Sequence, residues 1–371
     1  MKIAWLELRR RPSRFATATI ILTLIATLLM LLGGLLDGLL DGSTSALAAQ
    51  RGDVVVFSGT AESSFPRSRI TPETAAQVEA VPGVADVGGI GVAQLGARVP
   101  GNGPRDLVDV AMFGYEIAPE GVPAPPADGE AYADRSLESG GVRKGMTIEL
   151  GPQRTKVLVI GWVDELAYSG QGTLWANIDT WRETLNANRP DAGLGDGVVQ
   201  SLVVKVDPDA DPAAVATRID RATDGATEAL TLDEAVNAIP GVEQQSSTFN
   251  QIIGVTVVIA VIVVALFFAL LTVERTALYG VLKAVGATSR SLFAGVVLQA
   301  VVVTLVASFV AAALALVLDL VVQPGGIPYV LLPTRVLSSV LFLLVAAIIG
   351  CAFSLRRVLS VDPASAIGSG S

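Results

Sequence analysis

The sequence predicts a membrane protein with four membrane-spanning helices and a large folded α+β domain between the first and the second. The 371 residues are 51% hydrophobic and only 16% charged, with a mean hydropathy of +0.57, whereas soluble domains average about 25% charged residues. The apolar residues are concentrated in four uncharged runs, each near the roughly 20 residues that cross a bilayer. The long segment between the first and second runs has mixed polarity, which is typical of a folded domain.

The elements can be assigned in chain order. Residues 1–14 are expected to form an amphipathic elbow helix on the membrane surface, interrupted at Pro12. The first run is too long for the 7–15 apolar residues of a cleaved signal peptide, so we expect it to be retained. Membrane spans are predicted at 15–36, 251–273, 291–318 and 336–355, with a short amphipathic helix at 274–290, a loop at 319–335, a tail at 356–367 and a terminal cloning scar at 368–371.

The charge distribution predicts the orientation. The formal net charge is −9, and residues 37–250 contain 31 of the 35 acidic residues but only 15 of the 26 basic ones. The other flanks of the four spans are rich in Arg and Lys, which accumulate on the cytoplasmic side of a membrane. We therefore expect both termini in the cytoplasm and residues 37–250 outside it. An acidic chain also argues against nucleic acid as a partner.

The outer domain is predicted to alternate helices and strands. Thr71 followed by Pro72 is typical of a helix start, and Asp211 followed by Pro212 repeats the pattern. Strands are expected at 53–57, 84–92, 147–150, 156–163, 201–206 and 227–231, and loops at 99–105 and 121–129. We interpret this as a helical and strand lobe made of 43–115 and 198–235, with a β-rich lobe at 116–197 inserted into it.

The short helix at 274–290 carries a family resemblance. Its apolar residues repeat at helical spacing, and its sequence at 274–288, ERTALYGVLKAVGAT, resembles the coupling helix of FtsX/MacB-type (type VII) ABC transporter permeases. Further resemblances to that family are LRRRPSRF at 8–15, VRKGMTIEL at 142–150 and DPASAI at 362–367. Four spans with one large MacB-like extracytoplasmic domain are also the topology of that family.

The resemblance implies a transport subunit rather than an enzyme. It implies a homodimer in a bacterial plasma membrane, in contact with lipid, which works with two copies of an ABC ATPase subunit that binds ATP and Mg²⁺. The sequence has no GxxxxGK[ST] phosphate loop, so we expect that ATPase to be a separate polypeptide. No intrinsic cofactor is expected. The residues expected to couple to the ATPase are Glu274, Arg275, Leu278, Leu282, Lys283 and Gly286.

Within the family, the chain is most similar to the HrtB-type haem exporters and their DevC-like relatives. The similar segments are LLDGLLDGS at 35–43, DVVVFS at 53–58, RSRI at 67–70 and IPGVEQQ at 239–245. Haem export would have to work without histidine, which the chain lacks. Methionine, tyrosinate and carboxylate remain as iron ligands.

A candidate haem site follows from one face of the first span. Thr19, Thr23, Thr27, Met30 and Gly34 are three or four residues apart, so they share a small, mildly polar face. One interpretation is packing of small residues between helices. The other is a lipid-accessible haem site at the dimer interface, with Met30 as a candidate iron ligand and Thr23, Thr27 and Gly34 beside it. Glu243 is the candidate second iron ligand or, alternatively, a group next to a haem propionate. Apart from that haem iron, no metal site is predicted.

Three functions remain open at this point. The first is an ATP-driven exporter of an amphipathic, membrane-partitioning molecule, for which haem is the best candidate. The second is mechanotransmission, in which the outer domain acts on a lipoprotein, peptide or cell-wall partner and nothing crosses the bilayer. The third is a sensor or scaffold in the envelope that transports nothing. An enzyme is disfavoured, because no nucleophile–base pair is visible, and the lone Cys351 cannot form an intramolecular disulfide.

Overall fold

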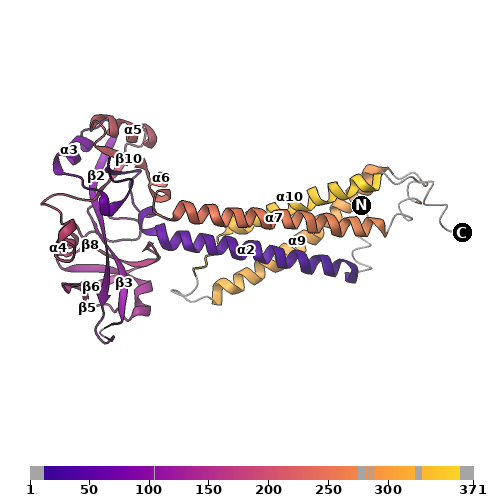
Figure 1. The fold of residues 1–371 in the computed structure, drawn as a ribbon, viewed down its shortest axis with the longest axis horizontal. Helices are drawn as coiled ribbons and strands as arrows, with labels where there is room; N and C mark the ends of the chain where they lie inside the picture. Colours follow the sequence, from indigo (N-terminus) through magenta and orange to yellow (C-terminus); the bar gives the residue numbers. More distant parts are fainter. Residues whose placement is uncertain are drawn as a thin grey trace. The chain divides into compact units, whose positions relative to one another are not determined.

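The computed structural model describes residues 12–103, 105–274, 281, 285, 288–321 and 328–359. Its contacts divide the chain into a helical unit, from 1–38 and 246–371, and an outer unit, 39–245. Four of the described helices are long and apolar enough to span a membrane, and a mixed α/β domain lies in sequence between the first and second. The predicted fold class is thereby confirmed (Figure 1).

Within the described residues, the helical unit contains four long helices. They are α2 (Pro12–Ala48), α7 (Val242–Val273), α9 (Ser289–Val321) and α10 (Pro333–Leu359). α2 continues to Ala48 and α7 begins at Val242, so both helices are longer than the spans predicted from hydropathy and each contributes residues to both units.

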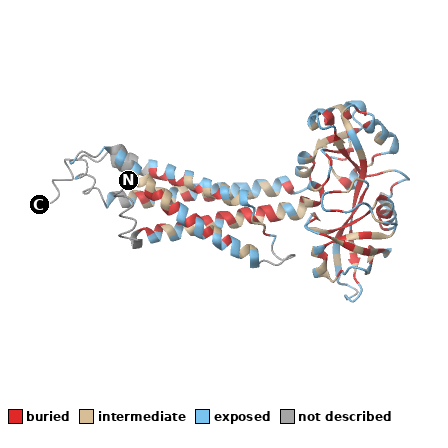
Figure 2. Ribbon diagram, turned by 180° about the vertical axis from the view of Figure 1, so that it is seen from behind, coloured by how far each residue is buried: buried red, intermediate tan, exposed pale blue. Residues whose placement is uncertain are grey.

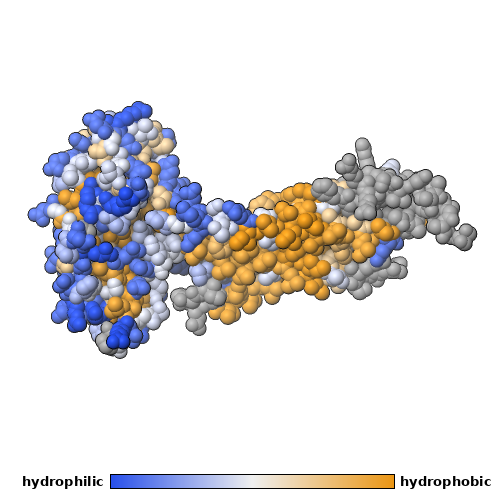
Figure 3. All heavy atoms as spheres, in the orientation of Figure 1, coloured by the Kyte–Doolittle hydropathy of each residue, from blue (hydrophilic) through white to orange (hydrophobic). Residues whose placement is uncertain are grey.

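Each of these helices has one buried and one exposed face (Figure 2). The exposed faces are apolar, with Ile20 and Leu24 on α2 and Phe309 on α9 more than half exposed. Figure 3 shows the resulting apolar surface over the helical unit, in contrast to the mainly polar surface of the outer unit. Exposed apolar area on this scale marks a surface that faces lipid or another apolar partner.

The outer unit is built on one sheet. Its strands are β1 (Val54–Ser58), β2 (Val84–Arg98), β3 (Leu107–Tyr115), β4 (Glu130–Asp134), β5 (Thr147–Leu150), β6 (Thr155–Val163), β7 (Ala167–Tyr168), β8 (Gln171–Asn177), β9 (Ser201–Val206) and β10 (Thr227–Thr231). The strand order is β10-β1-β9-β2-β3-β8-β4-β6-β5, with β7 beside β8. β5 also pairs with the end of β2, so the strands from β2 to β5 in that order close into a ring.

Short helices cover this sheet. They are α3 (Pro72–Glu79), α4 (Ile178–Asn188), α5 (Pro212–Ala222) and α6 (Leu232–Asn237), with 3₁₀ turns η1 (Phe65–Arg67), η2 (Arg135–Gly140) and η3 (Pro190–Ala192). Thr71 and Asp211 cap α3 and α5 as predicted, accepting hydrogen bonds from the backbone N–H groups of Thr74 and Ala214. The sequence patterns do not predict α4, α6, β3, β4, β7 or β8.

The long strand β2 joins the two predicted lobes. Its first part pairs with β9 and its last part with β5, and β3 pairs with it along most of its length. The lobes therefore share one hydrogen-bonded sheet and are not joined only by connecting loops. Two apolar clusters of buried side chains pack against this sheet.

Candidate functional site

Met30 is completely buried in the helical unit. It belongs to an apolar cluster with Ala260 of α7 and with Ala311 and Ala315 of α9, all almost inaccessible. Alanine side chains at these positions let neighbouring helices approach closely. In this arrangement the face of α2 that carries Met30 is a packing surface, and the thioether is shielded from lipid and from solvent.

The other predicted residues on this face have different surroundings. Thr23 and Thr27 are half-buried, and the hydroxyl of Thr27 has no hydrogen-bond partner among the described residues. Gly34 lies against the ring of Tyr329, since a Cβ at this position would stand 2.3 Å from Tyr329 Cε2. Glu243 is exposed in the first turn of α7, belongs to the outer unit and is not part of the cluster around Met30.

The predicted coupling residues fall mostly outside the described chain. Arg275, Leu278, Leu282, Lys283 and Gly286 lie outside the described residues, as do the predicted elbow helix up to Arg11 and the predicted tail from Ser360. Glu274 is exposed directly after α7, and its backbone N–H donates to the carbonyl of Leu270 at 3.0 Å. Among the described residues, no group of three His, Cys, Asp or Glu side chains is placed to hold a metal ion.

A partly buried ion pair joins α2 to the start of α10. The guanidinium of Arg335 donates to both carboxylate oxygens of Asp37, at 2.9 Å from Nε and 2.5 Å from Nη2. The Asp37 side chain is 8% exposed and that of Arg335 is 26% exposed. Gly33 makes room for this contact, because a Cβ there would stand 2.5 Å from Arg335 Cδ. Such a bidentate pair fixes both distance and orientation.

The segment before α10 is held by the same region. The Val330 N–H donates to the carbonyl of Gly34 at 3.1 Å, and the Leu331 N–H donates to Asp319 Oδ1 at 3.2 Å. The buried Tyr329 hydroxyl has no partner among the described residues. The sequence patterns do not predict this polar cluster. The available signal is that Asp37 directly follows the first uncharged apolar run and Arg335 directly precedes the fourth.

The carboxyl end of α2 is tied into the outer unit. The Ser45 hydroxyl accepts from the Ala167 N–H at 2.9 Å, and the Ser169 N–H donates to the carbonyl of Ser43 at 3.0 Å. Ala46 and Leu47 are fully buried in an apolar cluster of this unit. The last turns of α2 are thus part of the core of the outer unit.

Two family models match this chain and together cover most of it. The MacB-like periplasmic core domain matches residues 15–222, and the FtsX-like permease C-terminal model matches residues 250–363. The first of these alone covers more than half of the chain.

Curated relatives and solved structures are more distant. A protein named as a hemin transport system permease, HrtB, of Staphylococcus epidermidis is 22% identical over 143 residues, 38% of this chain and 41% of the relative. Its counterpart in Staphylococcus haemolyticus is 28% identical over 130 residues, 35% of this chain and 37% of the relative. The chain thus matches about two fifths of the length of these relatives.

Two solved structures of outer domains are also similar. The periplasmic region of MacB from Actinobacillus actinomycetemcomitans is 11% identical, with a TM-score of 0.36 over 52% of this chain and 95% of that structure. The extracellular domain of the ABC-type transporter YknZ from Gram-positive bacteria is 13% identical, with a TM-score of 0.33 over 48% of this chain and 98% of that structure. Because both family models match and four of the described helices are long and apolar enough to span a membrane, this chain belongs to the FtsX/MacB-type membrane permeases and carries a MacB-like periplasmic core domain.

Proposed function

We propose that this chain is the permease subunit of an ATP-driven exporter for an amphipathic, membrane-partitioning molecule, and that haem is its substrate. The observation that carries the proposal is family membership over both halves of the chain, together with the HrtB relatives. In this proposal both termini are cytoplasmic, two copies of the chain form a dimer, and segment 274–290 docks into a separate ATPase subunit.

The surface of the helical unit supports a substrate that partitions into lipid. The exposed faces of α2, α7, α9 and α10 are apolar, so a molecule in the bilayer can reach them without crossing a polar layer. The described spans contain polar side chains that are buried, among them Gln299, Thr304 and Ser308. Buried polar groups inside a membrane bundle often mark functional positions.

Iron ligation by Met30 has a specific structural requirement. Because the Met30 side chain is 0% exposed and packs on α7 and α9, haem iron can reach its sulfur only if α2 separates from those helices. A thioether side chain can ligate haem iron. The proposal therefore assigns Met30 to an open state of the transport cycle. Glu243 precedes Ala260, which packs with Met30, by 17 residues of the same helix, or about 25 Å at 1.5 Å per residue, so it cannot ligate the same iron.

The test is a haem titration of the purified full-length chain, followed by its Soret absorption. Haem bound to the wild-type protein should show a shifted Soret band. Met30→Leu should reduce the shift, whereas Glu243→Gln should leave it unchanged, because Glu243 lies outside the cluster around Met30. Leucine keeps the volume of Met30, so the bundle should stay folded. Matched controls are Met146→Leu and Glu79→Gln in the outer unit, which should bind as wild type does. A wild-type protein that gives no Soret shift, or equal shifts in all five proteins, rules out this site.

Mechanotransmission is the second candidate function, and one observation favours it. α2 and α7 each continue without interruption from the helical unit into the outer unit, and the end of α2 is anchored by Ser43, Ser45 and Leu47. A movement of these helices would therefore reach the outer unit directly. This function predicts an extracytoplasmic protein that cross-links to the outer unit in an ATP-dependent manner, whereas haem export predicts none.

A further inference from the structure

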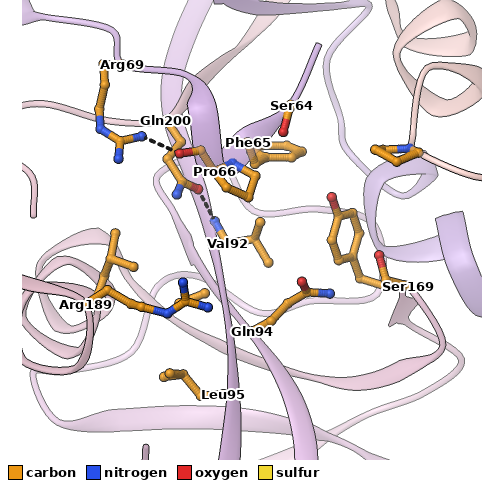
Figure 4. Close-up of a pocket in the computed structure, with 14 residues that line it drawn as sticks. Ser64, Phe65, Pro66, Arg69, Val92, Gln94, Leu95, Ser169, Arg189 and Gln200 are labelled. Carbon is orange, nitrogen blue, oxygen red and sulfur yellow. Dashed lines mark hydrogen bonds between the residues drawn. The ribbon is translucent and has the colours of Figure 1, made fainter. Parts of the chain in front are cut away.

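A pocket in the outer unit lies where the two lobes meet. It has a cavity volume of about 230 Å³. Its walls come from β2, from the η1 segment, from α4 and from the turn after β7, as Figure 4 shows. The lining residues are Ser64, Phe65, Pro66, Arg69, Val92, Ala93, Gln94, Leu95, Tyr168, Ser169, Leu185, Arg189, Gln200 and Pro240.

The charge of this pocket is opposite to that of its surroundings. Two of the lining residues are arginines and none is Asp or Glu, although residues 37–250 contain 31 acidic and only 15 basic residues. A concave site lined by one sign of charge concentrates ligands of the opposite sign. The positive charge of this pocket should therefore attract an anion.

Three polar groups can hold that anion. Gln200 is 2% exposed, and its carboxamide oxygen accepts from the Val92 N–H at 2.7 Å. The other end of the carboxamide, the Gln200 amide nitrogen, is a donor with two N–H groups that a bound anion can accept from. Figure 4 shows Arg69 and Arg189 on either side of the Gln200 side chain.

The two arginines are placed differently. Arg69 Nη1 donates to the carbonyls of Pro66 and Ser68, at 3.0 and 2.7 Å, which fixes the guanidinium at the rim. Partial burial lowers the pKa of Arg69, and a bound anion would offset that desolvation. Arg189 follows α4 directly and is exposed, and its guanidinium makes no hydrogen bond within the described part of the chain. Planar guanidinium groups match a carboxylate with two parallel hydrogen bonds.

The rest of the pocket is uncharged and mostly apolar. Phe65, Val92 and Leu185 supply apolar wall, and burial raises the pKa of Tyr168 to about 12, so its hydroxyl stays neutral. A cavity of about 230 Å³ is smaller than the roughly 300–1,000 Å³ that drug-sized ligands occupy. The cavity can hold a molecule with one or two aromatic rings, and it is too small for haem.

We propose that this pocket binds a small amphipathic carboxylate, with the carboxylate held by Gln200 and Arg189 beside Arg69 and the apolar body against Phe65 and Leu185. A monoanion suits the site better than a dianionic phosphate, because only part of the site is open to water and a second charge adds to the desolvation cost. This site lies within the outer unit and is independent of the proposed haem site.

The test uses 2-naphthoate as the probe and the full-length chain in lipid nanodiscs, with binding measured by calorimetry. A ligand of this size should bind with a dissociation constant of about 0.1–1 mM. The neutral analogue 2-naphthamide should bind at least tenfold more weakly, and so should 1-naphthyl phosphate. Equal affinity for the carboxylate and the amide, or tighter binding of the phosphate, overturns the proposal.

Variants locate the binding in this pocket. Arg189→Gln should weaken 2-naphthoate about tenfold, the usual scale for one charge-assisted hydrogen bond. Gln94→Glu, an isosteric change at an exposed lining residue, should weaken it at least as much. Arg143→Gln is the matched control, because Arg143 is exposed in the same unit and does not line the pocket. An effect of Arg143→Gln as large as that of Arg189→Gln overturns the assignment, and unchanged thermal melts of all three variants verify folding.

Discussion

The attachment of α4 to the sheet depends on two glycines beneath Trp181. Gly91 of β2 and Gly114 of β3 lie directly opposite each other in the strand pairing, and Trp181 of α4 is 0% exposed. A Cβ on Gly91 would stand 2.0 Å from Trp181 Cζ2 and 2.2 Å from Cη2, whereas a Cβ on Gly114 would stand 2.4 Å from Trp181 Cβ. The two glycines therefore contact different ends of the same side chain.

We predict that Gly91→Ala and Gly114→Ala each destabilise the outer unit by about 3 kcal/mol, which is the upper end of the usual cost of overpacking. The cost is high because the rigid indole ring can avoid the added methyl group only if the whole side chain moves. In a domain of this size that corresponds to a melting temperature lower by roughly 6–12 °C. Gly96→Ala is the matched control on the same strand. The nearest atoms to its Cβ would all belong to the side chain of the exposed Leu107, with Cδ1 closest at 3.0 Å. Because that flexible side chain can move aside, the cost should stay within about 0.5 kcal/mol.

A second substitution distinguishes the two contacts. Trp181→Phe removes the ring atoms Cζ2 and Cη2 of the indole but keeps Cβ and Cγ, and it sacrifices no hydrogen bond, because Trp181 Nε1 has none among the described residues. Trp181→Phe alone should cost roughly 1–2 kcal/mol through lost packing. It should rescue Gly91→Ala, giving a double mutant about as stable as Trp181→Phe. It should not rescue Gly114→Ala.

The assay is chemical denaturation of the full-length chain, followed by tryptophan fluorescence, for the two double-mutant cycles. A coupling energy near zero between Gly91 and Trp181 would refute the packing argument. Equal rescue of both glycine variants would refute the assignment of each glycine to its own end of the side chain.

Three further predictions concern other contacts. Asp37→Asn should destabilise the helical unit by roughly 2 kcal/mol in a thermal melt. This is below the roughly 3–5 kcal/mol for breaking a fully buried pair, because Arg335 is partly exposed. Exchanging the two residues should restore part of the loss, and equal melting temperatures of the single and the exchanged variant would contradict this. Thr231→Ala should lower the free energy of unfolding by about 1 kcal/mol, because Thr231 and Glu234 form a capping box at α6. Hydrogen bonds from Thr231 lower the pKa of Glu234, so the part of this stabilisation that the Glu234 carboxylate supplies is present above the unfolded pKa of about 4.3 and is lost as the pH falls through the lower folded pKa. The hydrogen bond from the Glu234 N–H to the Thr231 hydroxyl does not titrate, so denaturation curves of the two proteins should differ less at pH 3 than at pH 7. Cys351 is 1% exposed, so a maleimide should label it only after a denaturing detergent has unfolded the helical unit. Rapid labelling of the native chain would contradict the buried position of Cys351.

Local sequence was sufficient for the membrane helices and for several elements of the outer unit. A run of uncharged apolar residues predicts a span because the bilayer acts on each side chain separately. Thr71 and Asp211 cap helices through hydrogen bonds to residues three positions away. Signals of this kind are contained in one short window of sequence.

The predictions were less complete where partners are distant in sequence. Trp181 and α4 were missed because only Gly91 and Gly114, from two other strands, provide the surface on which that helix packs. Likewise, Met30 lies on the small, mildly polar face of α2 that the sequence spacing predicts. Whether that face contacts lipid or other helices depends on the positions of α7 and α9.

The sequence by itself determined four membrane-spanning helices and an acidic domain between the first and the second, because hydropathy, charge and capping depend on neighbouring residues; the assignment as a permease came from the resemblance of residues 274–288 to a known family. Only the tertiary structure decided that β2 unites the two lobes, that Asp37 pairs with Arg335, and that Gln200 and Arg189 line one pocket. The physical reason is that these contacts join residues far apart in the chain, and their geometry is fixed only when the sheet and the helices have packed.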